Sequence, residues 1–259
     1  MITLTTDFGV TDHYTGTMKG VIASIAPRVP VADITHLIEP FNILDGAFTI
    51  AEAYPYFPKK TIHVVVVDPG VGTSRRPILV EAGGQYFIGP DNGVFSLIYA
   101  RERPHKVRAI TNEKFFLPTP SRTFHGRDIF APAAAHLAKG AKSAQFGKLI
   151  SDPIQLTGLT PERSGKRVWT GTVLKVDHFG NLITNFHSSE FPQIATQPFE
   201  MLVGIQTVRL LALHYQDSNI GGLFVIVGSS GYLEVSTSQG SAAKILGCGA
   251  QAPVELTIW

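Results

Sequence analysis

Cysteine is almost absent from this sequence, and its scarcity excludes two kinds of protein. Cys248 is the only cysteine in 259 residues, so the chain has neither a disulfide framework nor a cysteine-based zinc site. The nine histidines form no HExxH motif and no paired spacing of a zinc site, so we expect no metal in the chemistry. Long hydrophobic runs are missing too, because no apolar stretch approaches the roughly 20 residues that a membrane-spanning helix needs.

Charge is also scarce. Charged residues make up 16% of the chain, the formal net charge is +2, and no block of Lys and Arg occurs. A nucleic-acid-binding surface draws its affinity from clustered basic side chains, so we expect no such partner. The N-terminus lacks the basic segment and long apolar stretch of a signal peptide. The sequence therefore predicts a soluble, cytoplasmic protein, and its 44% of hydrophobic residues can build a sizeable core.

The familiar phosphate-binding and hydrolase motifs are missing as well. The segment 70–76, GVGTSRR, has no Gly-Lys-Ser/Thr ending and no strand–GxGxxG–helix context. The segment 228–231, GSSG, is not the Gly-x-Ser-x-Gly turn of an α/β-hydrolase. What remains is a set of separate loops with residues able to do chemistry, namely Asp7, Asp68, Arg75, His125 and Asp177.

The most informative stretch is 61–76, TIHVVVVDPGVGTSRR. Its apolar, β-branched run predicts a strand buried on both faces, which Pro69 and Gly70 bring to an end. Asp68 then lies at the carboxyl end of a central strand, where open α/β sheets bind ligands. The plainer alternative is that Asp68 only caps a turn, and this stretch alone leaves both readings open.

The first half of the chain alternates strands with helices. Expected strands cover 2–6, 29–34 and 62–67, and an amphipathic helix is expected over 42–53. This alternation predicts an α/β domain over 1–155 with a mostly parallel central sheet. Asp7 ends the first strand, and His125 precedes an alanine-rich helix. A single histidine in such a place is often a structural group, so its role is open at this point.

The second half has a different texture. Segment 151–166 is rich in Pro, Gly and polar residues and predicts a domain boundary. Beyond it, five or six short strands separated by Gly, Asn and Ser predict an all-β, barrel-like domain over 166–259. Within it, Asp177, Phe179 and Asn181 offer carboxylate and amide groups beside an aromatic face, which suits a nucleoside or an amino-acid zwitterion. A simple β-turn at Gly180 is the alternative.

Five motifs together resemble a known family. TTDFG, VVVDPGVGTSRR, GPDNG, TFHGRD and DHFGNLITN are similar to those of the S-adenosyl-L-methionine (SAM) hydroxide adenosyltransferases, also called adenosine-forming SAM hydrolases. These enzymes are relatives of the fluorinating and chlorinating enzymes that use SAM. The resemblance runs from the first strand to the last in the same order. It implies an N-terminal α/β domain and a C-terminal barrel-like domain, in agreement with the expectations above.

The resemblance also implies roles for individual residues. Asp68 and His125 would bind and polarise a water molecule in the first domain, and Arg75 would hold Asp68 ionised and oriented. The second domain would complete the substrate pocket. The implied substrate contacts are Asp7 on the ribose diol, Phe41 near the ribose or adenine, and, on the methionine or adenine side, Asp177, Phe179, Asn181, Ser229 and Glu234.

The implied reaction is hydrolysis of SAM to adenosine and L-methionine by attack of water or hydroxide at C5′. SAM is the substrate, no further cofactor or metal is expected, and the family resemblance implies a homotrimer with shared active sites. Fluorinating relatives carry Tyr at position 68, Tyr-Ser at 125–126 and an insertion after the central loop, so this chain is expected to use water. They also have Arg at position 230, where this chain has Ser. A non-catalytic adenosine or SAM sensor and a halogenase are the alternatives.

Overall fold

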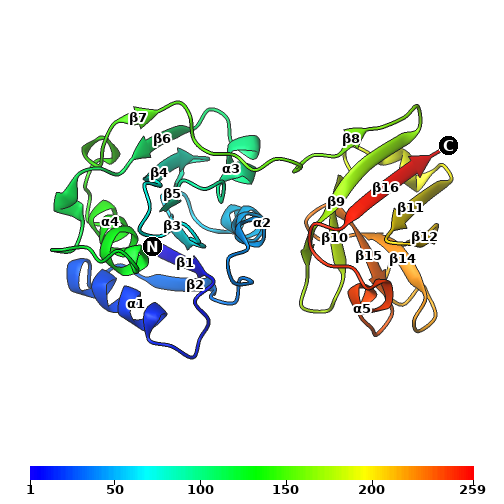
Figure 1. Cartoon of the computed structure of the whole chain (residues 1–259), viewed down its shortest axis with the longest axis horizontal. Coiled ribbons are helices and arrows are strands. Elements are labelled where there is room, and N and C mark those ends of the chain that lie inside the picture. Colours follow the sequence, from blue (N-terminus) through cyan, green and yellow to red (C-terminus); the bar gives the residue numbers. More distant parts are fainter. The chain divides into compact units, whose positions relative to one another are not determined.

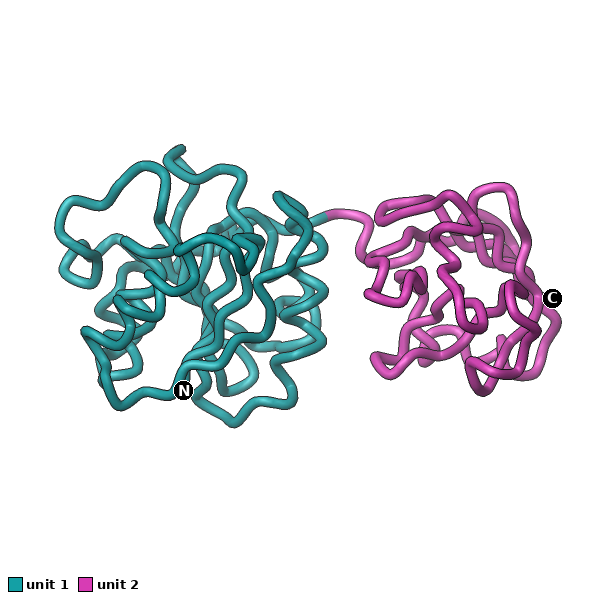
Figure 2. Tube along the Cα trace, turned by 90° about the horizontal axis from the view of Figure 1, so that it is seen from below, with its two compact units in different colours: residues 1–156 teal, residues 157–259 magenta.

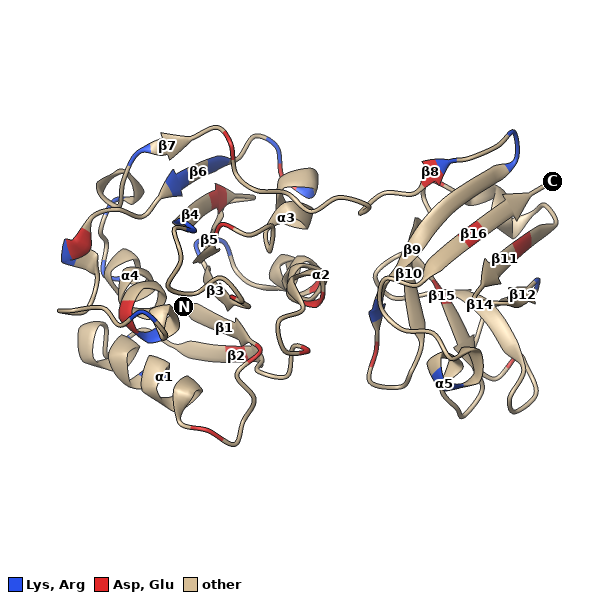
Figure 3. Cartoon of the chain, in the orientation of Figure 1, with Lys and Arg blue, Asp and Glu red and all other residues tan.

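A computed structural model describes residues 1–259 and divides the chain into two units, Met1–Leu156 and Thr157–Trp259 (Figure 2). The first ends inside segment 151–166, which the sequence marks as a boundary. Acidic and basic residues are interspersed in both units (Figure 3). None of the helices combines the length and the apolar character needed to cross a membrane.

Unit 1 is built on a seven-stranded sheet in the order β2-β1-β3-β5-β4-β6-β7 (Figure 1). Its strands are β1 Ile2–Thr6, β2 Val31–Thr35, β3 Ile62–Val66, β4 Pro77–Ala82, β5 Gln85–Pro90, β6 Lys106–Ala109 and β7 Leu149–Ile150. The neighbours from β2 to β5 pair in parallel, whereas β4, β6 and β7 continue the sheet in antiparallel pairs.

The sheet is therefore mixed. The expectation of a mostly parallel sheet is wrong for the part that β4, β6 and β7 form. The physical reason lies at Gly83 and Gly84, which both adopt positive φ and reverse the chain directly between β4 and β5. A turn this short can join only antiparallel strands, because a parallel pair needs a long crossover connection.

Helices cover both faces of this sheet (Figure 1). They are α1 Tyr14–Ile25, α2 Ile43–Ala53, α3 Ser96–Arg101 and α4 Ala131–Ala138, with 3-10 turns η1 Tyr54–Tyr56, η2 Glu113–Phe115 and η4 Ser143–Gln145 and a π-helix, η3 Gly126–Phe130. Met18 of α1 and Ala133 of α4 share a core with Leu4 and Val64 of the strands. Asn42 caps α2 by accepting a hydrogen bond from the backbone N–H of Asp45 at 3.0 Å, so this predicted helix is confirmed.

Unit 2 is a nine-stranded sheet in the order β12-β11-β16-β9-β10-β15-β14-β13, with β8 beside β9. Its elements are β8 Glu162–Arg163, β9 Val168–Val176, β10 Leu182–His187, β11 Phe199–Val203, β12 Gln206–Val208, β13 Leu211–Ala212, β14 Leu223–Val227, β15 Tyr232–Thr237 and β16 Pro253–Ile258, with η5 Pro192–Ala195 and a short helix, α5 Ala242–Leu246. Met201 and Leu256, near one end of the strand order, share a core with Val225 and Leu233, near the other end. The sheet therefore curls around this core as a half-barrel, with more strands than the sequence predicted.

A buried polar chain ties together the strands that lead to the pocket of unit 1. His63 on β3 is fully buried and lies between Thr3 of β1 and Gln85 of β5. Gln85 donates its amide hydrogens to the carbonyls of Tyr54 and Phe57, so its oxygen must accept from His63 Nε2–H. His63 Nδ1 then accepts from the Thr3 hydroxyl at 2.7 Å. Burial lowers the pKa of His63 to about 4, so this ring is neutral in the folded protein.

Acidification is expected to destabilise unit 1 through His63. Because the folded pKa, about 4, lies below the ordinary value of 6.5, the unfolded chain binds the proton first as pH falls. The contribution of neutral His63 to the free energy of unfolding is fully present above pH 6.5. It is lost as the pH falls from 6.5 to 4, and the total loss is roughly 3 kcal/mol. Urea unfolding of wild type and of His63→Gln at several pH values measures it, with exposed His214→Gln as the control. An equal pH dependence in wild type and His63→Gln would contradict the assignment.

Candidate active site

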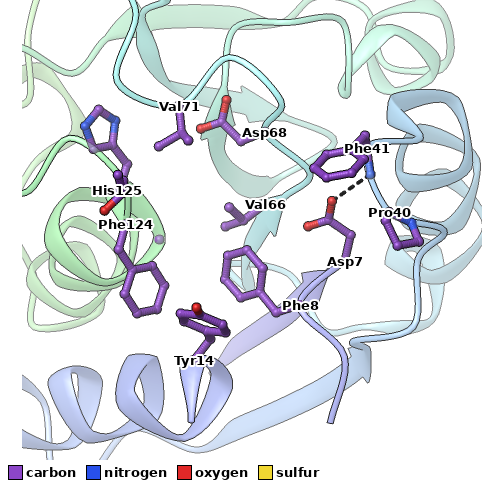
Figure 4. Close-up of a pocket in the computed structure, with 12 residues that line it drawn as sticks. Asp7, Phe8, Tyr14, Pro40, Phe41, Val66, Asp68, Val71, Phe124 and His125 are labelled. Carbon is purple, nitrogen blue, oxygen red and sulfur yellow. Dashed lines mark hydrogen bonds between the residues drawn. The ribbon is translucent and has the colours of Figure 1, made fainter. Parts of the chain in front are cut away.

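Two acidic residues meet at one edge of the unit 1 sheet. β1 and β3 pair in parallel with Thr6 opposite Val66, so Asp7 and Asp68 follow the ends of neighbouring strands. They line a cavity of about 390 Å³ together with His125, Phe8, Tyr14, Phe41 and Phe124 (Figure 4). The prediction that ligand-binding groups gather at the carboxyl ends of these strands agrees with this geometry.

Arg75 joins Asp68 to His125. Its Nε donates to Asp68 Oδ1 at 3.0 Å, and its Nη2 donates to Asp68 Oδ2, so the pair is bidentate. Nη2 also lies 2.7 Å from Nδ1 of His125. The Arg75 and Asp68 side chains are only 8% and 5% exposed, and the guanidinium lies over the ring of Phe130. The structure thus brings His125 to Asp68 and Arg75, although His125 lies 50 residues after Arg75 in the sequence.

The contact with Arg75 fixes the protonation of His125. A guanidinium has only donors, so Nδ1 of His125 must accept and the ring proton must sit on Nε2. Burial, and next the positive charge of Arg75, lower the pKa of His125. His125 is therefore a neutral ring at pH 7, and in this arrangement it can donate a proton but has no free nitrogen to take one.

Only one oxygen of the Asp7 carboxylate accepts a hydrogen bond. Its Oδ2 accepts from the backbone N–H of Phe41 at 2.9 Å, which leaves Oδ1 as the free oxygen (Figure 4). Burial raises the pKa of Asp7, although the bond from Phe41 partly opposes this. Phe41 adopts a φ of 66°, which is uncommon for a residue with a side chain, and its ring is 72% exposed.

Sequence reasoning missed an aromatic cluster in the pocket. Phe8, Tyr14 and Phe124 contact one another, with ring centroids 5.1 to 5.7 Å apart. Two of these residues lie directly beside motif residues, because Phe8 follows Asp7 and Phe124 precedes His125. That adjacency was a usable signal, whereas Tyr14 lies at the start of α1 and carries none.

The predicted residues of unit 2 fall into two groups. Asp177 Oδ1 accepts from the backbone N–H of both Phe179 and Asn181 at 2.9 Å, and its Oδ2 accepts from the Asn181 amide at 2.8 Å. This carboxylate stabilises its own turn, so the simpler of the two sequence interpretations accounts for its contacts. The Phe179 ring is 74% exposed, and Ser229 lies exposed in the turn between β14 and β15.

Glu234 differs from these residues because it is buried with little support. It is 6% exposed on β15, and its one hydrogen bond is a long one, 3.4 Å, from the Tyr215 hydroxyl. Burial, and then the charge of Asp177, raise the pKa of Glu234 to about 7. Gly228 leaves the space for it, since a Cβ at position 228 would lie 1.8 Å from Glu234 Oε1.

Comparisons with known proteins match both parts of the chain to one family. Residues 2–147 match the SAM hydroxide adenosyltransferase N-terminal domain, and residues 171–255 match the C-terminal domain of the same family. A (R)-S-adenosyl-L-methionine hydrolase of Salinispora tropica is 39% identical over 95% of this chain and 93% of its own length. A fluorinase of an Actinoplanes species is 27% identical over 91% of this chain and 90% of its own.

A solved structure gives the same result for the fold. An uncharacterized conserved protein from Thermotoga maritima is 35% identical, covers 99% of this chain and 100% of its own, and superposes with a TM-score of 0.92. Family motifs, two matching domains and a shared fold thus extend over nearly the whole chain. The protein belongs to the SAM hydroxide adenosyltransferase family.

Proposed function

We propose that this protein is an enzyme that hydrolyses SAM to adenosine and L-methionine. The observation that carries the proposal is the Arg75-centred triad at the edge of the unit 1 pocket, in a chain whose relatives include enzymes named (R)-S-adenosyl-L-methionine hydrolase. SAM is the substrate, and the chemistry needs no further cofactor. A passive SAM sensor would need the pocket but not a buried, bidentate Arg75–Asp68 pair.

The reaction is a displacement at C5′ of the ribose. The oxygen of water forms a bond to C5′ while the C5′–S bond breaks and its electron pair returns to sulfur, leaving methionine as a neutral thioether. The sulfonium is already a good leaving group, so no acid has to protonate it. The enzyme's task is to hold a water molecule in line with the C5′–S bond and away from bulk solvent.

Asp68 is the group that binds this water and receives its proton. Each carboxylate oxygen accepts one bond from Arg75 and keeps a further acceptor site, so an O–H of the water can donate to it. Neutral His125 holds Arg75 and borders the pocket but cannot act as the base in this tautomer. The proton released in the reaction then passes from Asp68 to solvent.

Asp7 and Phe41 suit the ribose end of the substrate. The free Oδ1 of Asp7 can accept from the ribose hydroxyls, and the exposed ring of Phe41 can pack on the ribose or the adenine. We assign the methionine and adenine side to Asp177, Phe179, Asn181, Ser229 and Glu234 of unit 2.

Heavy-oxygen water tests the proposed reaction. In water enriched with oxygen-18, SAM is expected to give adenosine labelled at its 5′ hydroxyl, because the nucleophile comes from solvent. Mass spectrometry of the nucleoside measures the label. Parallel reactions with added chloride or fluoride should give no 5′-halogenated nucleoside as the main product. A halonucleoside as main product, or no turnover of either SAM epimer, would refute the proposal.

Glu234 is expected to bind the substrate's α-ammonium group in its ionised form. Because the pKa of Glu234 is raised to about 7, its charge grows as pH rises, and KM for SAM should fall several-fold between pH 6 and 7.5. Glu234→Gln should raise KM and abolish this pH dependence while kcat changes little. Inhibition by adenosine, which has no ammonium group, is the control and should stay unchanged. An unaltered pH dependence of KM in Glu234→Gln would exclude the contact.

We further propose that the protein is a homotrimer with shared active sites, in which unit 1 of one chain meets unit 2 of another. The loops around the unit 1 pocket expose large apolar side chains, Val10, Leu37 and Phe41, each about 70% exposed. Such a group is unusual on a surface that stays in water. In this trimer, a neighbouring chain would contribute the substrate residues proposed in unit 2.

A further inference from the structure

We infer that Asp128 is a positioning residue for the reaction, because it anchors the loop that holds His125 against Arg75, the contact that sets the tautomer of the ring. The inference rests on the proposed function for its link to catalysis, but not for its effect on the His125 ring. Asp128 does not line the pocket, so it acts through other residues. It is 2% exposed, and nothing in the proposed chemistry uses it directly.

Asp128 lies in a π-helix that starts directly after His125. η3 spans Gly126–Phe130, with His125 as its N-cap and the backbone N–H of Ala131 bonded to the carbonyl of Gly126. Single π turns are rare in proteins as a whole, but those that do occur are often found at functional sites. Here the turn places the Asp128 carboxylate under the loop 117–124 that leads to His125.

The carboxylate and the backbone carbonyl of Asp128 both hold this loop in place. Its Oδ2 accepts from the backbone N–H of Ser121 at 2.8 Å, and its own backbone carbonyl accepts from Leu117 at 2.9 Å. Arg127 donates to both carboxylate oxygens, at 2.6 and 3.1 Å. Burial alone would raise the pKa of Asp128, but the bonds from Arg127 and Ser121 hold it below its ordinary value. Asp128 is therefore ionised, and its carboxylate accepts three hydrogen bonds.

Ser121 links Asp128 to the residue before His125. The Ser121 hydroxyl oxygen accepts from the backbone N–H of Phe124 at 3.0 Å, and Phe124 directly precedes His125. The Nδ1 atom of His125 in turn accepts from Arg75 Nη2 at 2.7 Å. Hydrogen bonds and one peptide bond thus connect Asp128 through Ser121, Phe124, His125 and Arg75 to Asp68, where the water is proposed to bind.

The loop is also held from the side of Arg75. Gly72 adopts a φ of +80°, and a Cβ at that position would lie 2.3 Å from the carbonyl oxygen of Arg122. The loop that carries Ser121 and the loop that carries Arg75 are therefore in direct backbone contact. Asp128 fixes one side of this contact, so its removal would loosen the contact between His125 and Arg75.

The test compares three variants that remove different hydrogen bonds of the Asp128 carboxylate. Asp128→Ala removes the acceptor for Ser121, Asp128→Asn keeps a carbonyl oxygen in its place, and Arg127→Ala removes the ion pair but leaves the Ser121 acceptor intact. For Asp128→Ala we expect kcat to fall about 10-fold or more with KM little changed, as when a histidine loses the partner that sets its tautomer. Asp128→Asn and Arg127→Ala should keep most of kcat.

Nitrogen NMR of histidine-labelled protein gives a readout that does not depend on activity. The wild-type His125 signal, assigned by its loss in His125→Gln, should show a neutral ring protonated at Nε2, and Asp128→Ala should show mixed tautomers. A wild-type ring protonated at Nδ1, or an unchanged tautomer and kcat in folded Asp128→Ala, would overturn the inference. So would an equal loss of kcat in Arg127→Ala, which would indicate a merely stabilising ion pair. If the protein proved not to hydrolyse SAM, the NMR result would still decide the inference for the ring.

Discussion

Replacing Asp68, Arg75 or His125 with alanine is expected to lower kcat by roughly 100-fold or more, the usual scale for losing a positioned acid–base group. Asp68→Ala removes the oxygens that we assign to the water. Arg75→Ala leaves the buried Asp68 carboxylate without its bidentate partner, and His125→Ala leaves Arg75 Nη2 without its second contact. Stopped assays with SAM, at substrate concentrations that separate kcat from KM, measure the effect.

Two variants serve as controls for this experiment. Arg76→Ala removes the neighbouring guanidinium, which pairs instead with Asp91 and Asp152, so its kcat should stay close to wild type. Asp7→Ala should raise KM far more than it lowers kcat, because Asp7 is assigned to the ribose and not to the water. Near-normal kcat in folded Asp68→Ala would show that the water binds elsewhere.

The pH dependence of kcat in the wild type tests the protonation state of His125. Burial and the charge of Arg75 lower the pKa of His125, so the ring stays neutral down to a pH below 6.5. Protonation of Nδ1 would replace the acceptor that Arg75 needs with a donor. The acid limb of kcat is therefore expected below pH 6.5, and a limb above that value would contradict the neutral ring.

Mixing two inactive variants is expected to restore activity if the active sites are shared between chains. His125→Ala is defective in unit 1, and Asp177→Ala is defective in unit 2, where it also releases the turn that carries Phe179 and Asn181. In a ring built from heterologous interfaces, random exchange gives some interfaces with two intact halves, and about a quarter of wild-type activity should return. Assays after subunit exchange, with the mass determined by light scattering, measure both claims.

The matched control mixes two variants that are both defective in unit 1. His125→Ala with Asp68→Ala should recover nothing, because every site then takes its unit 1 from a defective chain. Recovery only in the first mixture would establish sharing. No recovery in either mixture, or a fully active monomer, would refute the shared site.

The sequence was informative where a local rule decides the structure. The β-branched run before Asp68 ends at Pro69-Gly70 because proline and glycine cannot continue a strand, and Asn42 predicts the start of α2 because its side chain caps a helix. The glycine pair Gly83-Gly84 also indicates that β4 and β5 are antiparallel. The expectation of a mostly parallel sheet did not take this turn into account.

Contacts between distant segments were beyond any local rule. Arg75 and His125 are 50 residues apart, so only family resemblance placed them together. The π turn after His125 has no sequence pattern of its own, and the sequence therefore gave no reason to notice Asp128. Asp177 shows the opposite case, since the plain reading of DHFGN as a turn accounts for every hydrogen bond of its carboxylate.

The pairing of β1 with β3 at the centre of the sheet has a consequence for how the enzyme loses activity on heating. Asp7 and Asp68 are attached to strands buried on both faces, and backbone amides in such strands exchange with solvent mainly when the whole domain unfolds. We therefore expect the strands to keep the backbones of the two acids together until unit 1 unfolds, and we expect substrate entry to depend on the surrounding loops. Thermal inactivation of the site should accordingly follow the global melting of unit 1, with no preceding phase in which the fold survives and the acids drift apart.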